Sequence, residues 1–203
     1  MNSKTKHILL LLLAAVLMTT PAYGKKVKNI IFLIGDGMGL TQMYAGMTKN
    51  GGHLNLEQCQ YVGLSKTYSA DSYITDSAAG GTALACGVKT NNGMLGMTPD
   101  SAAVKSILHI AEENGKATGI VVACSVTHAT PAAFVAHQPS RSMDKEIAED
   151  YLKTDIDVFI GGGRKFFEKK KRNLTSELKE KNYQVVTEMS DLQNIHSGKV
   201  AGL

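Results

Sequence analysis

The chain has 203 residues and a formal net charge of +4, with 22 basic and 18 acidic side chains. So small a charge gives no reason to expect binding to nucleic acid or to a membrane surface. The sequence has no tryptophan and is only 6% aromatic, so it also lacks an evident platform for stacking bases.

Residues 1–24 are predicted to be a signal peptide. Two lysines precede the apolar run Ile8–Met18, which is shorter than the ~20 residues that span a bilayer. Ala22-Tyr23-Gly24 has small residues at the spacing of a cleavage site, and a retained membrane anchor is the alternative. Cleavage would lower the net charge to +2 and leave residues 25–203 as one exported domain, periplasmic or extracellular, with no membrane contact.

An apolar, β-branched run, Val27–Ile34, is followed by Gly35-Asp36-Gly37-Met38-Gly39. The run predicts a buried strand of a mainly parallel sheet. Asp36 would then lie at the carboxyl end of the strand, where open α/β sheets bind their ligands. The alternative is a turn aspartate that caps the next helix. The glycine spacing is neither that of a dinucleotide fingerprint nor that of a P-loop.

Ser77 is a candidate nucleophile. It lies in Thr75-Asp76-Ser77-Ala78-Ala79-Gly80-Gly81-Thr82-Ala83, between an extended approach over 68–74 and a predicted helix over 78–85. A serine at or near the N-cap meets backbone N–H groups that lack helical partners, and these favour an anion. An ordinary capping serine is the alternative.

The rest of the sequence alternates between helices and strands, as in an α/β domain. Gly161–Gly163 reads as a turn, with a phosphate cradle as the alternative, and the basic run Lys169–Arg172 as a solvated segment. Helices are predicted over 38–49, 101–114, 143–154 and 176–181, strands over 118–123, 158–160 and 183–186, and a helix or loop over 188–195.

Three cysteines, Cys59, Cys86 and Cys124, show no zinc-finger spacing. An oxidising compartment would permit one disulfide and leave one thiol over. Cys86 and Cys124 fall in segments that we expect to be buried, so they can equally be core thiols.

Five blocks together resemble the alkaline phosphatase family. They occur in one order along the chain: Asn29–Gly39, Thr75–Ala79, Cys86–Gly96, His128–Ala133 and Val135–Arg141. The resemblance extends from about Lys28 to the end. It implies a three-layer α/β sandwich with a mainly parallel central sheet, of which this chain would be the incomplete N-terminal part.

The resemblance implies hydrolysis of phosphate monoesters through a phosphoserine, at a site with two Zn²⁺ and one Mg²⁺. Ser77 would attack phosphorus and Arg141 would bind the phosphate. Asp36 would bridge a zinc and the magnesium, and Thr130 would bind the magnesium. His128 matches a position that is aspartate in some members, so it would tune magnesium affinity or accept zinc there. The metal-binding residues that the resemblance implies are thus Asp36, Ser77, His128 and Thr130.

Taken without the family, these residues have simpler interpretations. Arg141 would be a solvated arginine, Thr130 a pre-proline turn residue and His128 a turn or surface histidine. Asp76 is expected to orient the arginine or the turn. The other histidines show no close pairing, and His137 is interpreted as structural.

By resemblance, most zinc ligands and the last magnesium carboxylate belong to a further part of the family's chain. A truncated, non-catalytic chain that binds Mg²⁺ or phosphate therefore stays an alternative, as does a related phosphodiesterase. A sulfatase is disfavoured because no arginine follows Ser77 at the required spacing. The resemblance also implies a homodimer for the full-length protein.

Overall fold

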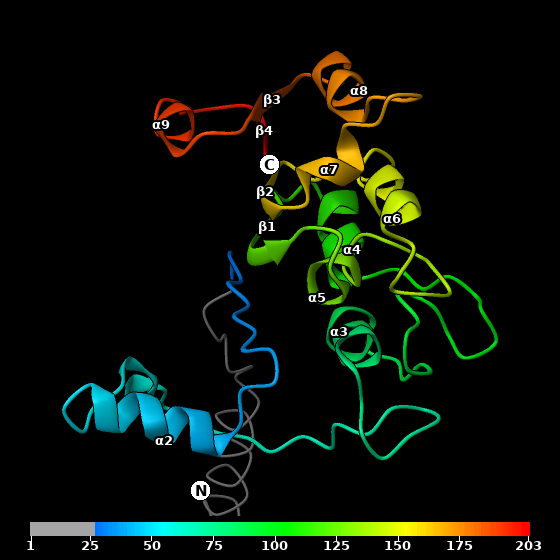
Figure 1. The fold of residues 1–203 in the computed structure, drawn as a ribbon. Helices are drawn as coiled ribbons and strands as arrows, with labels where there is room; N and C mark the ends of the chain where they lie inside the picture. The colour runs from blue at the N-terminus through cyan, green and yellow to red at the C-terminus, as the bar shows by residue number, and fades with distance from the viewer. Residues whose placement is uncertain (1–26) are drawn as a thin grey trace, which may run out of the picture. The chain divides into compact units, whose positions relative to one another are not determined.

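The computed structural model describes residues 27–203 (Figure 1). The predicted signal peptide, 1–24, lies outside the described residues. The chain divides into two compact units, one ending at Gly35 and the other running from Asp36 to Leu203. Within the described part, no helix combines the length and apolar character needed to cross a membrane.

The predicted buried strand at 27–34 is not formed. The structure assigns no strand to this run, and Ile31 and Leu33 are 87% and 86% exposed. An apolar, β-branched sequence favours an extended backbone, but a strand also requires a neighbouring strand for its N–H and C=O groups. Local preference was therefore not sufficient to create the strand that we expected here.

The second unit contains a four-stranded parallel sheet in the order β1-β2-β4-β3, which confirms the predicted α/β class. Its register aligns Ile120 with Phe159 and Phe159 with Ala201. Three strands match predictions, whereas β4 was not anticipated. The strands are β1 Gly119–Ser125, β2 Val158–Gly162, β3 Tyr183–Val186 and β4 Lys199–Gly202.

The predicted helices lie near their expected positions, with one clear difference, whereas the short helices over 55–58, 129–132 and 164–167 were not predicted. The helix expected over 101–114 begins only after Ser106, whose side chain caps it by accepting the His109 N–H. Ser101 instead has a positive φ of 67°, which ends any helical run there. The helices are α2 Leu40–Lys49, α3 Ser77–Cys86, α4 Ile107–Glu113, α5 Ala129–Ala132, α6 Asp144–Asp150, α7 Arg164–Phe167, α8 Leu174–Glu180, α9 Met189–Leu192 and the 3-10 helix η1 Asn55–Gln58.

One face of the sheet forms the core. Figure 1 shows α4, α6, α7 and α8 on one side of the strands. The aromatic rings of Tyr151 and Phe159 meet there at 4.7 Å. The opposite face is more open, since Val121 is 72% exposed. Cys124 is exposed, so the prediction that it is buried was wrong. The buried set includes Leu108, Ile120, Ile147, Phe159, Phe167, Leu178 and Ala201.

The glycine run at the end of β2 is packed rather than open. Gly161 and Gly162 belong to the strand, so the predicted turn begins only at Gly163, which has a φ of 98° and caps α7. A Cβ on Gly161 would lie 2.6 Å from a Val122 methyl, and one on Gly163 would meet the Ser125 hydroxyl. Because side chains of β1 fill this space, the phosphate-cradle alternative is not supported.

Candidate active site

Ser77 is the first residue of α3, and Asp76 is the N-cap. The Asp76 Oδ1 accepts the Ala79 N–H at 2.9 Å, which satisfies one of the free donors of the first helical turn. The prediction that Ser77 lies at or near the N-cap is therefore confirmed. The approach over 68–74 bends instead of running straight, because the Ser69 N–H donates to the Ser72 carbonyl.

Small side chains allow α3 to pack closely against α5. A Cβ added to Gly81 would lie 3.0 Å from that of Ala133, so the helices approach almost to backbone contact. Ala78 of α3 and Ala129 of α5 are both buried. The Ala- and Gly-rich sequence of α3 thereby places Thr130 beside the helix end that carries Ser77.

Asp36 lies between two hydroxyl groups. Its Oδ1 accepts from the Ser77 hydroxyl at 3.2 Å, and its Oδ2 accepts from the Thr130 hydroxyl at 2.9 Å. The aspartate sits in a turn that continues through Gly37, where φ is 64°. Three residues that are 41 to 94 positions apart in sequence thus converge on one carboxylate.

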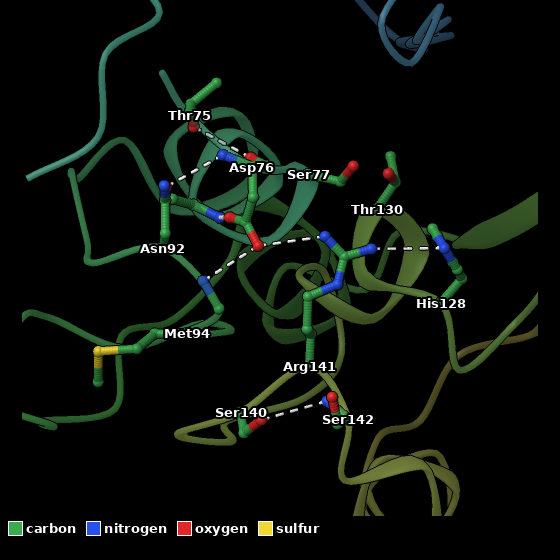
Figure 2. Close-up of polar contacts among 12 residues, drawn as sticks. Thr75, Asp76, Ser77, Asn92, Met94, His128, Thr130, Ser140, Arg141 and Ser142 are labelled. Carbon is green, nitrogen blue, oxygen red and sulfur yellow. Dashed lines mark hydrogen bonds and ion pairs between the residues drawn. The ribbon is translucent and has the colours of Figure 1, made fainter. Parts of the chain in front are cut away.

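Arg141 connects the nucleophile turn with His128 (Figure 2). Its Nη1 lies 3.1 Å from Asp76 Oδ2, and its Nη2 lies 3.4 Å from His128 Nε2. The guanidinium is partly buried, with 30% of the side chain exposed. Of the two residues from this block, His128 therefore contacts the arginine and Thr130 contacts Asp36.

The Asp76 carboxylate is stabilised in its charged form. Partial burial alone would raise the pKa of Asp76, but hydrogen bonds from the Ala79 and Gly93 amides and from Arg141 outweigh it and lower the pKa. The expectation that Asp76 orients the arginine or the turn fits this geometry, because the one carboxylate contacts both.

Sequence reasoning assigned no role to the loop over 91–97, which supports this arrangement. The Gly93 carbonyl accepts the Arg141 N–H at 2.7 Å, and Leu95 pairs with Gln138 through two backbone hydrogen bonds. Asn92 accepts the Asp76 N–H at 3.0 Å. Because an Asn-Gly pair is a turn signal, the sequence indicates a bend in this loop. These hydrogen-bond partners of the loop lie 16 to 48 residues away, and no local pattern indicates them.

His137 is structural, as its place in the sequence suggested. Its Nδ1 lies 2.8 Å from the Gly96 carbonyl oxygen, and its ring stacks on that of His109 at 5.3 Å. Both contacts fix the segment that precedes Arg141. Burial and the neighbouring His137 lower the pKa of His109.

The groups that donate hydrogen bonds to Asp36 are the hydroxyls of Ser77 and Thr130. Carboxylate and hydroxyl oxygens suit a hard cation such as Mg²⁺, and among residues 27–203 Asp36 is the carboxylate that hydrogen-bonds to Ser77 and Thr130. Residues 27–203 contain no group of three His, Cys, Asp or Glu side chains that would hold a metal ion. The described residues therefore bring oxygen atoms together at Asp36 without a group of three such side chains beside them.

The comparisons with known proteins agree on one family. The family model for alkaline phosphatase matches residues 27–203. Alkaline phosphatases 4 and 3 of Bacillus subtilis (strain 168) are 40% and 39% identical to the chain, over 88% of it and 42% of each relative. The chain thus spans about two-fifths of the length of these curated relatives.

Solved structures give the same result. The alkaline phosphatase from the Antarctic bacterium TAB5 matches with a TM-score of 0.79 and 41% identity, over 83% of this chain and 51% of that one. Two variants of that enzyme, with a histidine replaced by glutamate or aspartate, have magnesium bound in the site called M3. The cold-active enzyme of Shewanella matches with a TM-score of 0.74. From the family match and these relatives, the chain belongs to the alkaline phosphatase family.

Proposed function

We propose that the protein hydrolyses phosphate monoesters with Ser77 as the nucleophile, forming a phosphoserine. The observation that carries this proposal is the convergence of Ser77, Asp36, Thr130 and Arg141 at the start of α3. The helix N-terminus presents backbone N–H groups and a positive dipole end to a phosphate that reaches Ser77. A serine hydroxyl is a weak nucleophile, and the nearby Asp36 carboxylate favours loss of its proton.

Arg141 is proposed to bind the phosphate. The Asp76 carboxylate contacts Nη1 and so fixes the plane of the guanidinium, while other N–H groups of the fork stay available for phosphate oxygens. The ion pair is partly shielded from solvent, which strengthens it relative to an exposed pair. In this role Asp76 orients the arginine and leaves the chemistry to Ser77.

Magnesium fits the oxygen donors, and we propose that Asp36 and Thr130 hold it. When bound, it would supply positive charge beside the reacting phosphate. His128 contributes a softer nitrogen on the arginine side, where it would tune this affinity or accept zinc. A zinc pair does not fit residues 27–203 alone, since they lack the ligand set described above. We therefore assign no step to zinc in this chain.

A second proposal concerns the chain of 203 residues by itself. Because its described residues lack a group of three His, Cys, Asp or Glu side chains for a metal, it would bind phosphate or Mg²⁺ without turnover. The anion site at Arg141 and the first turn of α3 requires no metal ligand. Turnover by the isolated chain would contradict this second proposal.

Proposals on export and assembly rest on the leader sequence and on the family resemblance. We propose that the leader over 1–24 directs the protein out of the cytoplasm and that the full-length protein is a homodimer acting on external phosphate esters. N-terminal sequencing of the exported protein tests the first point, because the mature chain should begin at Lys25. Light scattering of that protein tests the second.

The deciding experiment is hydrolysis of p-nitrophenyl phosphate at alkaline pH with Zn²⁺ and Mg²⁺. Full-length protein should be active, and Ser77→Ala should lose roughly 10⁴-fold or more in kcat. Ser142→Ala is the matched control, because Ser142 is an exposed serine next to Arg141 and should retain activity. Full activity in Ser77→Ala would sink the proposal.

A further inference from the structure

Asn92 ties together three parts of the segment that leads into α3. Its side-chain Oδ1 accepts the Asp76 N–H at 3.0 Å, and its Nδ2 donates to the Ile74 carbonyl at 2.9 Å. Its own backbone N–H donates to Asp71 Oδ1 at 2.9 Å. The side chain therefore bridges the turn on both sides of Thr75, immediately before Ser77. Figure 2 shows Asn92 beside Asp76.

The Asp76 amide depends on this side chain for a partner. Asp76 is the N-cap and has extended backbone angles, with φ −92° and ψ 175°, so its N–H takes no part in the helix. The Asn92 oxygen is the acceptor that the structure gives to that N–H. Its removal would leave the peptide unit between Thr75 and Asp76, one unit before the one that joins Asp76 to Ser77, free to rotate towards solvent.

The following residue extends the connection to the arginine. The Gly93 N–H donates to Asp76 Oδ2 at 3.1 Å, and the Gly93 carbonyl accepts the Arg141 N–H at 2.7 Å. Asp76 Oδ2 also accepts from Arg141 Nη1. The dipeptide Asn92-Gly93 thus holds the nucleophile turn on one side and the arginine backbone on the other.

We propose that Asn92 is a positioning residue that fixes Ser77 relative to Arg141. This inference rests on the proposed function, in which both residues act on one phosphate. Asn92 itself contacts neither the phosphate nor the reacting atoms, and it acts through Asp76. Displacement of a reacting group by about 1 Å can cost on the order of a hundredfold in rate. The hydrogen bonds of the Asn92 side chain would therefore affect catalysis by holding Ser77 in place.

The preceding residue provides a matched control. Asn91 contributes its backbone carbonyl to a hydrogen bond from the Met94 N–H at 3.1 Å. Among the described residues, its side-chain amide makes no hydrogen bond. Asn91→Ala and Asn92→Ala therefore remove the same chemical group from adjacent positions, and only the second removal breaks the bridge.

Two measurements on the 203-residue chain test the proposal. The first is hydrogen exchange of the Asp76 amide, which should accelerate at least about tenfold in Asn92→Ala and stay unchanged in Asn91→Ala. The second is the affinity for inorganic phosphate by calorimetry, which should weaken about tenfold in Asn92→Ala alone. Exchange within the second half of α3 should be the same in all variants, because the helix itself is retained.

A third variant separates positioning from folding. Asn92→Asp keeps an oxygen for the Asp76 N–H but cannot donate to Ile74, so amide protection of Asp76 should be retained. Because the added negative charge weakens phosphate binding by itself, hydrogen exchange is the readout for this variant. This variant carries the test if Asn92→Ala does not fold. Unchanged exchange and unchanged phosphate affinity in folded Asn92→Ala would overturn the proposal. If wild-type protein binds no phosphate and full-length protein hydrolyses no ester, the proposed function fails, and the exchange result alone decides whether Asn92 holds the turn.

Discussion

Residues 27–68 and residues 75–203 differ in how they use hydrophobic side chains. The first segment contains no buried residue, although it includes the apolar run over 27–34. The second holds the core, including Ala78, which is less hydrophobic than isoleucine but fully buried. Burial therefore follows from the surfaces available for packing and not from the hydrophobicity of a segment.

The contact between α3 and α5 explains how the second segment buries its small side chains. Gly81 and its alanine neighbours permit close approach of the two helices, and that approach brings Thr130 towards Ser77. Large side chains at these positions would separate the helices and widen the site. The small residues thus act by letting α3 and α5 lie close together, while the burial of their own side chains adds little to the stability of the fold.

The most direct test of this contrast uses one residue type in both segments. Ile156 is 0% exposed and Ile31 is 87% exposed. Ile156→Ala should lower the free energy of unfolding by roughly 2–5 kcal/mol, because it removes buried methyl groups and leaves a cavity. Ile31→Ala should change it by less than about 0.5 kcal/mol. Urea unfolding of the two variants measures both values.

A large loss in Ile31→Ala would contradict the exposed position of the run in solution. Concentration dependence of that loss would then indicate burial in an assembly, since association stabilises a folded chain by mass action. Independence of concentration would indicate burial within one chain.

The next test concerns Gly96, which has a φ of 58° in the loop that supports Arg141. A Cβ there would lie 2.2 Å from the Ala136 carbonyl oxygen, a backbone atom that cannot move aside alone. We expect Gly96→Ala to destabilise the fold by roughly 2–4 kcal/mol, through both strain and overlap. Thermal unfolding measures the loss.

Gly87 is the matched control for Gly96. It has a φ of 71° at the end of α3, but nothing lies within 4 Å of an added Cβ. Gly87→Ala should therefore cost about 1 kcal/mol from backbone strain alone. Equal losses in the two variants would mean that the loop over 91–97 shifts freely, and Arg141 would then not be held by it.

The sequence was informative where local chemistry decides the structure. The parallel α/β class, the start of α3 at Ser77 and the strand Tyr183–Val186 follow from periodicity and capping signals. The capping serine of α4, Ser106, was readable too, but the apolar spacing before it suggested a longer helix. Local signals identified these elements better than their ends.

Long-range contacts decided the rest. β4 has four residues, Lys199–Gly202, and is a strand because β2 and β3 flank it. The run over 27–34 has strong strand preference and forms no strand. The site residues were named through family resemblance, whereas the roles of Asn92 and Gly93 depend on contacts that no short-range pattern encodes.

The smallest expected effect concerns the pH dependence of the Asp76 contacts. Hydrogen bonds lower the pKa of this carboxylate below its ordinary value of 3.8 despite the opposing effect of burial. Its stabilisation should therefore be complete above that value and disappear as the pH falls through the lower folded-state pKa. Asp76→Asn should cost roughly 0.5–1.5 kcal/mol at neutral pH, and the difference from wild type should shrink in acid.

Urea unfolding at several pH values measures this difference, with Asp191→Asn as the control because Asp191 is an exposed carboxylate in α9. The control should show little difference from wild type at any pH. A cost of Asp76→Asn that stays constant from neutral to acidic pH would mean that the lost contact does not depend on charge. The ion pair with Arg141 would then not be the interaction that holds the arginine, and its orientation would be due to the backbone hydrogen bond from Arg141 to Gly93.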